Sequence, residues 1–115
     1  MSLDVYLYFD VDVGHDEPDE YVVFTANVTH NLNVMASEAG VYECLWRPGE
    51  HGITTAAQVA GRLSVGLDDM RLRPDHYKAF NPSNGWGDYD GFVKWCKAYL
   101  DACLEYPQAL VRVSR

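Results

Sequence analysis

Residues 3–13 read LDVYLYFDVDV, and in this stretch apolar side chains alternate with aspartate or tyrosine without interruption. The apolar residues run from Leu3 to Val13 on every second position. Successive side chains of a β-strand point to opposite faces of the sheet, so the pattern predicts a strand with one face toward the core. Because this inner face is the most apolar of the predicted strands, we expect residues 3–13 to be the central strand.

Two more stretches have the composition of strands. Residues 21–28 are rich in β-branched and aromatic residues, and they follow the charged turn GHDEPDE at residues 14–20. A hairpin between residues 3–13 and 21–28 is the simplest pairing. Residues 108–114 alternate again after a proline and predict a third strand. Together they predict a small, mostly antiparallel three-stranded sheet.

The middle of the chain has helical periodicity. Apolar residues recur at i, i+3 and i+4 in three segments, which predicts helices at about 29–46, 55–73 and 88–105. Gly40 lies inside the first segment and weakens a helix by about 1 kcal/mol relative to Ala. The order β-β-α-α-α-β predicts an α+β fold in which one domain covers all 115 residues and the helices pack on one face of the sheet.

Charge is distributed unevenly along the chain, whose formal net charge is −8. Residues 1–46 contain nine acidic residues and no Lys or Arg, whereas residues 47–115 contain eight acidic and nine basic residues. Proteins that bind a phosphate backbone need basic surface that displaces counterions. We therefore expect no direct nucleic-acid binding.

Cysteine content and hydropathy favour a cytoplasmic protein that does not associate with membranes. The apolar runs are shorter than the roughly 18 residues of a membrane span, and the N-terminal residues lack the basic and apolar regions of a secretory signal. The odd number of cysteines, Cys44, Cys96 and Cys103, argues against a disulfide framework. We expect them to be buried small hydrophobic residues in a reducing compartment.

Motifs for catalysis and metal binding are weak. Asp10, Asp12, His15 and Asp16 supply oxygen ligands, but their spacing departs from the calcium-loop pattern, and no Cys or His pair has zinc-ligand spacing. Cys44 with His30 or His51 has the residue types of a nucleophilic hydrolase, which is the least favoured alternative. We assign no catalytic residue, no metal ligand and no cofactor.

A set of polar and aromatic residues near the predicted element ends is the leading candidate site. An indole ring stacks on a flat ligand, Asn amides read its polar edges, and a guanidinium holds phosphate. The sequence therefore predicts a non-enzymatic binding protein for a small polar or nucleotide-like ligand. Alternatively, the tryptophans fill the core and the asparagines serve turns and caps. The predicted ligand-binding residues are His30, Asn31, Tyr42, Trp46, Arg47, Asn81, Asn84 and Trp86.

A second hypothesis places function on the outward face of the first strand. There the chain would act as an acidic inhibitor of a host protein or as a nucleic-acid mimic, with tyrosines as anchors. The same face offers a contact to a second copy of the chain, which makes a homo-oligomer a further alternative. The residues of this partner-binding hypothesis are Asp4, Tyr6, Tyr8, Asp10 and Asp12.

Two distinctive runs carry a resemblance to a known family. Residues 27–48, NVTHNLNVMASEAGVYECLWRP, and residues 80–89, FNPSNGWGDY, resemble a family of small bacteriophage and bacterial proteins of similar length and motif order. No activity is established for that family, so no residue role is carried over from it. The resemblance implies a phage or prophage setting and a cytoplasmic address, where a ligand-binding protein would sequester a host defence signal.

Overall fold

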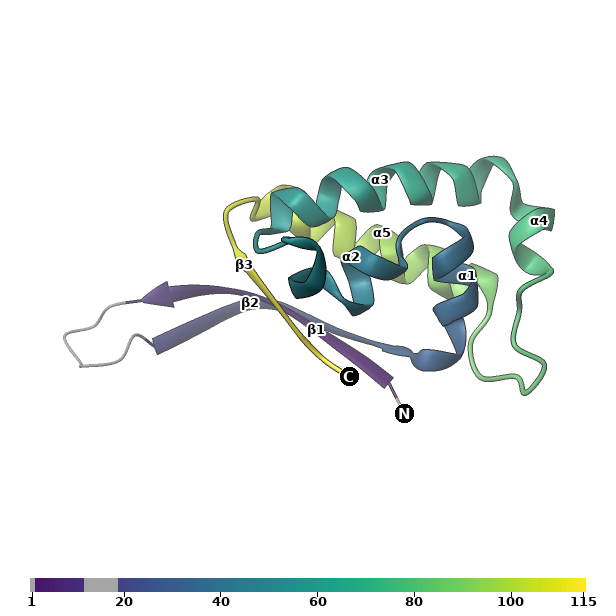
Figure 1. The fold of residues 1–115 in the computed structure, drawn as a ribbon, viewed down its shortest axis with the longest axis horizontal. Helices are drawn as coiled ribbons and strands as arrows, with labels where there is room; N and C mark the ends of the chain where they lie inside the picture. The colour runs from purple at the N-terminus through teal and green to yellow at the C-terminus, as the bar shows by residue number, and fades with distance from the viewer. Residues whose placement is uncertain (1, 12–18) are drawn as a thin grey trace.

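The structure, a computed structural model, describes residues 2–11 and 19–115. Its sheet has the strand order β2-β1-β3, with both pairings antiparallel, so the predicted sheet and the central position of the first strand are confirmed (Figure 1). The strands are β1 (Ser2–Val11), β2 (Asp19–Thr29) and β3 (Leu110–Ser114). The last two residues of the predicted first strand, 12 and 13, lie outside the described residues.

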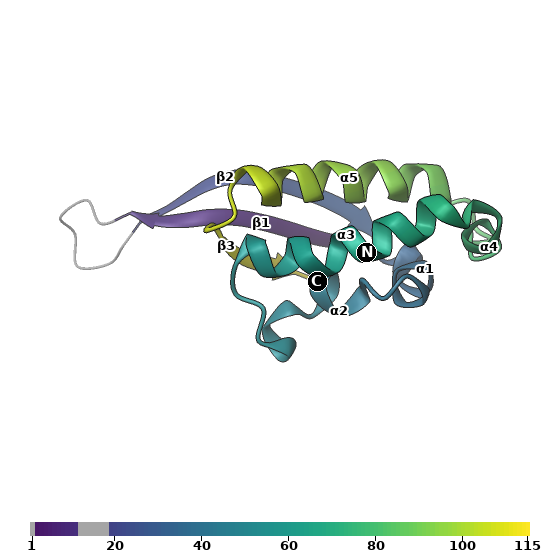
Figure 2. The same ribbon diagram turned by 90° about the horizontal axis from the view of Figure 1, so that it is seen from above.

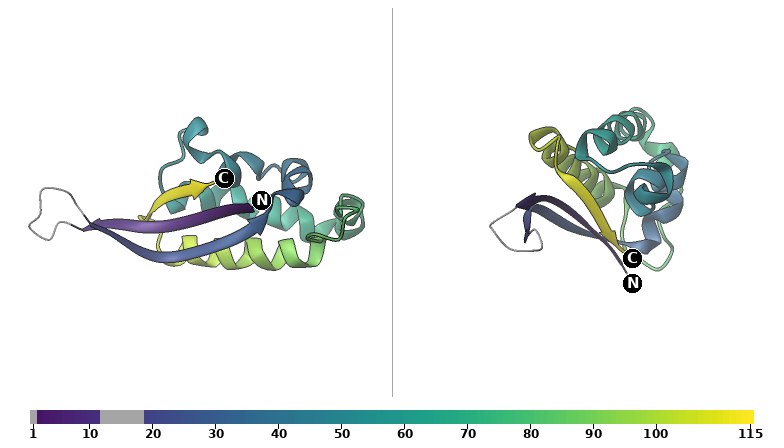
Figure 3. Two further views of the ribbon diagram at one scale, coloured as in Figure 1. Left: turned by 90° about the horizontal axis from the view of Figure 1, so that it is seen from below. Right: turned by 60° about the vertical axis from the view of Figure 1, so that its left-hand side comes forward.

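The sheet is covered by helices on one face, as its alternating pattern predicted. Leu3, Val5 and Leu7 point into the core and are fully buried. The helical elements are η1 (His30–Leu32), α1 (Asn33–Glu38), α2 (Tyr42–Trp46), η2 (Pro48–His51), α3 (Ala56–Leu72), α4 (Pro74–Lys78) and α5 (Tyr89–Glu105). The long helices α3 and α5 pack side by side, and α5 runs along β2 and contacts it (Figure 2). Figure 3 shows the sheet from its other side, where the described part of the chain places no helix.

The two long helices begin and end where the sequence predicted. Thr55 and Gln58 form a capping box at the start of α3. The Asp88 carboxylate accepts the Gly91 N–H at 2.7 Å and caps α5. These caps satisfy backbone donors that the first helical turn leaves without partners, which explains why local sequence defined the boundaries.

The prediction of one helix over residues 29–46 was wrong. This segment contains η1, α1 and α2, and the break after α1 lies at Gly40, whose φ is 75°. The Val41 N–H donates to the Ala36 carbonyl at 2.9 Å across the break. A left-handed glycine of this kind ends a helix by satisfying its last carbonyl groups, so Gly40 is a terminator and not a weak point within a helix.

Side chains of both long helices complete the core. Phe24 of β2 stacks on Tyr99 of α5, with ring centroids 5.8 Å apart and an interplanar angle of 5°. The three cysteines are free and buried, as expected. Their thiols lie within the layer between sheet and helices, where burial raises the pKa of each.

Gly66 is the point of closest approach between α3 and the turn after α1. A Cβ at this position would lie 2.2 Å from Cγ1 of Val41 and 2.7 Å from the Ala39 carbonyl oxygen. Since the carbonyl is backbone, it cannot move away without displacing the turn. The absence of a side chain at Gly66 therefore lets α3 pack directly on the segment that positions α2.

We expect Gly66→Ala to destabilise the fold by about 1–3 kcal/mol through overpacking, although Ala is the better helix former. Gly61 lies on the same helix with nothing within 4 Å of its virtual Cβ, so Gly61→Ala is a matched control. It should stabilise by up to about 1 kcal/mol. Urea unfolding of both variants measures the difference, and equal effects would contradict the close approach.

Candidate functional site

Most of the predicted ligand-binding residues line two hollows, whose linings include Ser2 and Arg115 near the two ends of the chain. The two ends lie close together at one end of the sheet (Figure 1). The Trp86 hollow, of about 540 Å³, is lined by Ser2, Asn27, Thr29, Asn31, Asn84 and Trp86. The Arg47 hollow, of about 700 Å³, is lined by His30, Asn33, Tyr42, Trp46, Arg47, Val113 and Arg115. Seven of the eight predicted residues thus belong to one hollow or the other.

A short segment separates the two hollows. Thr29 and Asn31 line the Trp86 hollow, whereas His30 and Asn33 line the Arg47 hollow. The segment turns sharply because η1 follows β2 directly, and the Thr29 hydroxyl accepts the Asn31 backbone N–H at 3.3 Å. The two hollows are therefore neighbours on either side of one turn.

Aromatic packing builds the wall of the Arg47 hollow. The Trp46 indole N–H donates to Nδ1 of His30 at 2.8 Å. Because an indole nitrogen can only donate, neutral His30 carries its ring hydrogen on Nε2. The Tyr42 ring stacks on Trp46 at 5.5 Å, and its hydroxyl accepts a hydrogen bond from Nε of Arg47 at 3.2 Å.

Trp46 is 2% exposed and belongs to the core, as the alternative for this residue predicted. Its contribution to the hollow is indirect, because its ring supports Tyr42 and its N–H orients His30. The accessible aromatic surface on this side therefore belongs to Tyr42, which also lines two smaller hollows beside α1.

The Arg47 hollow is cationic within an acidic chain. Arg47 and Arg115 both line it, and its described lining contains no Asp or Glu side chain. Glu50, just outside the lining, pairs with Arg47 at 3.1 Å in an exposed ion pair. Exposed pairs of this type contribute little, so the Arg47 guanidinium can exchange Glu50 for an anionic ligand at small cost.

The Trp86 hollow is built by a glycine-flanked loop. Gly85 and Gly87 have positive φ, and the Trp86 N–H donates to Oδ1 of Asn84 at 2.9 Å. A Cβ on Gly87 would meet Thr29 Cγ2 at 2.8 Å, so the loop packs tightly against the turn that follows β2. This contact leaves the Trp86 side chain 69% exposed at the mouth of the hollow.

Asn81 lies outside both hollows. Its Oδ1 accepts the Tyr89 backbone N–H at 2.8 Å, at the start of α5. The role in turns and caps that the sequence offered as an alternative therefore describes Asn81. Conversely, sequence reasoning missed Asn27 and Asn33, which lie in the same distinctive run as His30 and could have been found there.

Arg115 was also missed, and no motif in the sequence singles this residue out. It reaches the Arg47 hollow because β3 pairs with β1 and ends beside α2. Only the strand order brings this residue near Arg47.

The outward face of β1 differs from the anchor surface of the partner-binding hypothesis. The Arg112 guanidinium lies 4.7 Å from the Tyr6 ring centroid and 5.5 Å from that of Tyr8. Arg112 also pairs with Glu20 at 2.6 Å. Both tyrosines therefore have a cation from β3 packed over them.

The acidic residues of that hypothesis are dispersed. Asp4 accepts a hydrogen bond from Nδ2 of Asn27 at 2.6 Å, and Asp10 is exposed further along β1. Asp12 lies outside the described residues. The same holds for His15 and Asp16 of the weak metal motif, and among residues 2–11 and 19–115 no group of three or more potential ligands could hold a metal ion.

The environment of Cys44 weighs against the hydrolase alternative. Its Sγ is buried and donates to the Val41 carbonyl at 3.3 Å. Burial raises the pKa of this thiol to about 12, so the nucleophilic thiolate is disfavoured at neutral pH. His30 is bonded to Trp46, and His51 lies 3.6 Å from Glu43.

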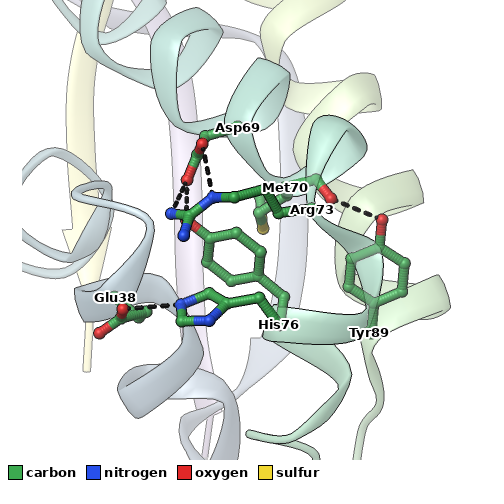
Figure 4. A network of polar contacts seen from close by, with 7 residues as sticks. Glu38, Asp69, Met70, Arg73, His76 and Tyr89 are labelled. Atoms are coloured by element: carbon green, nitrogen blue, oxygen red, sulfur yellow. Dashed lines mark hydrogen bonds and ion pairs between the residues drawn. The ribbon is translucent and has the colours of Figure 1, made fainter.

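A separate polar network joins α3 and α4 to α1 (Figure 4). Arg73 makes two hydrogen bonds to the Asp69 carboxylate, from Nε at 3.0 Å and from Nη2 at 2.6 Å, and the Tyr77 hydroxyl donates to the same carboxylate. His76 contacts Glu38 at 2.8 Å. Since these residues line neither hollow, we interpret the network as a structural connection that holds α4 in place.

Comparisons of the chain with protein-family models, with curated proteins and with solved structures found no match. The resemblance to a phage family therefore stays a prediction. In the described part of the chain, no helix has the length and apolar character that crossing a bilayer requires.

The network around Asp69 predicts a pH dependence of stability. The hydrogen bonds from Arg73 and Tyr77 lower the pKa of Asp69 to about 2. A lowered pKa means that the folded state favours the carboxylate, so this stabilisation is present above about pH 4, the ordinary Asp pKa. It is lost as the pH falls through the folded-state value.

We expect Asp69→Asn to lower the free energy of unfolding at neutral pH, and the difference from the wild type to shrink as the pH falls from about 4 toward 2. Asp68→Asn is the matched control, because Asp68 is the exposed neighbour on the same helix. Urea unfolding across this pH range measures both. A pH-independent loss in Asp69→Asn would contradict the assigned role.

Proposed function

We propose that the protein is a non-enzymatic binding protein for a small anionic ligand of the nucleotide type, held at the two hollows. One observation carries the proposal: an exposed indole, side-chain amides and two guanidinium groups line neighbouring hollows on either side of one turn of the chain. Hollows of 300–1,000 Å³ are the usual size for small-molecule sites, and both fall within it.

The two hollows suggest a division of roles. The exposed Trp86 ring would stack on the flat part of the ligand, beside the Asn31 and Asn84 side chains. Arg47 and Arg115 would hold its phosphate or carboxylate group. The Nε2–H of His30 is a further donor on that side, fixed by the bond from Trp46.

Binding, and not turnover, is the role that these groups suit. They offer a stacking surface, amides and cations, whereas the chain's thiols are buried away from the hollows. In the phage setting and cytoplasmic location that the family resemblance implies, a binding protein would act by sequestering a host defence signal.

A thermal-shift assay against mono-, di- and cyclic nucleotides tests this proposal. A ligand at 100 times its Kd should add about 2.7 kcal/mol to the free energy of unfolding and raise Tm. Arg47→Gln should weaken binding about tenfold by removing the charge-assisted contact, and Trp86→Ala should weaken it by removing the stacking surface.

The control variant is Arg71→Gln, which removes an exposed arginine of α3 that lines neither hollow. It should leave the ligand-induced shift unchanged. No shift with any nucleotide, or an equal loss in Arg71→Gln, would reject the site.

A further inference from the structure

The hairpin of β1 and β2 extends beyond the rest of the sheet. β3 pairs with β1 only between Asp4 and Tyr8, whereas β2 pairs with β1 out to Val11. We call the two-stranded extension, residues 9–11 and 19–21 with Val22 at its base, the arm. Figures 1 and 2 show it projecting past the ends of α3 and α5.

The base of the arm packs against the body, and a β-bulge lies next to it. Phe9 packs edge-on against Tyr106, with ring centroids 6.4 Å apart. The β1–β2 register shifts between Leu7 and Tyr8, so Val23 is an extra residue on β2. A bulge of this kind bends a strand and increases its twist, which directs the arm away from the sheet.

Apolar side chains on the arm are exposed. Val11, Tyr21 and Val22 have exposed fractions of 39%, 64% and 44%. They are three of the eight large hydrophobic residues exposed in the described part of the chain. Because Phe9 lies opposite Tyr21 and Tyr8 opposite Val22, Val11 and Tyr21 share one face of the ribbon and Val22 lies on the other. A two-stranded ribbon is only marginally stable by itself, so such side chains gain most from a covering partner.

The negative charge of the arm indicates a partner with positive charge. Its described charged residues are Asp10, Asp19 and Glu20, all exposed, and Arg112 of β3 pairs with Glu20 at its base. Beyond Tyr8 both long edges of the ribbon are free of a third strand in the described part of the chain. Free strand edges bind an extended segment through main-chain hydrogen bonds.

We propose that the arm binds an extended, basic segment of another protein, which adds as a strand to the β2 edge. Val11 and Tyr21 cover its apolar side chains on one face of the ribbon. On the opposite face Asp10, beside the Arg112-paired Glu20, pairs with its Lys or Arg residues, and Asp19 adds negative charge at the start of β2. A second copy of this chain would bring like-charged arms together, and a nucleic acid would place phosphates against carboxylates. The interaction uses none of the hollow residues, so it is independent of the proposed ligand.

The partner-binding hypothesis from sequence changes in its anchors and keeps one of its acids. The anchors move from Tyr6 and Tyr8, which Arg112 covers, to Val11 and Tyr21 on the arm. Asp10 keeps its role, because it lies beside Glu20 on the arm.

The test uses the full chain and a fluorescent synthetic peptide of alternating lysine and valine, followed by fluorescence anisotropy. The wild type should bind the peptide and not a peptide of alternating glutamate and valine. The double variant Asp10→Lys/Asp19→Lys should raise the Kd at least about tenfold, and Tyr21→Ser should raise it several-fold.

Matched controls place the same changes elsewhere on the surface. Asp68→Lys/Glu105→Lys makes the same charge change on exposed helix positions, and Leu72→Ser removes an exposed apolar side chain of α3. Both should bind the peptide with nearly the wild-type Kd, and NMR amide shifts should be confined to the arm and its base.

Several results would overturn the proposal. The first is that the wild type does not bind the lysine–valine peptide. The acidic residues of the arm would then serve solubility only. Equal weakening in the charge-matched control would indicate non-specific attraction. Self-association that Tyr21→Ser abolishes would identify a second copy as the occupant.

Discussion

The burial of Leu3, Val5 and Leu7 is the constraint on which the rest of the structure depends. These side chains fill the space beneath the helices only if β1 lies between β2 and β3. The resulting register places Ser2 opposite Thr29 and Asp4 opposite Ser114. One end of β1 therefore gathers the turn after β2 and the end of β3 around the two hollows, while its other end continues into the arm.

Two glycines allow the chain to turn and pack closely around the two hollows. Gly40 ends α1 and allows the chain to turn, so that α2 presents Tyr42 and Trp46 beside His30. Gly87 brings its loop against Thr29, which places Trp86 at the other hollow. Gly40 adopts a positive φ, which residues with a side chain adopt only with strain. At Gly87 a side chain would also collide with Thr29.

The cations of the Arg47 hollow and the acids of the arm, which are Asp10, Asp19 and Glu20, lie at opposite ends of the sheet. The net charge of −8 conceals this separation, because it sums groups that act at different places. An anionic ligand and a basic protein segment would thus meet different surfaces of one chain.

The α+β order, the central strand and the bounds of α3 and α5 could be predicted from the sequence, because side-chain periodicity and local capping bonds define them. Side-chain chemistry singled out seven of the residues that line the hollows, without showing which of them meet. The burial of Trp46, the position of Arg115 in the same hollow as Arg47 and the packing of Arg112 over Tyr6 became visible in the folded chain alone. The physical reason is that these contacts join strands and helices distant in sequence, and strand pairing, which local composition does not encode, sets which of them meet.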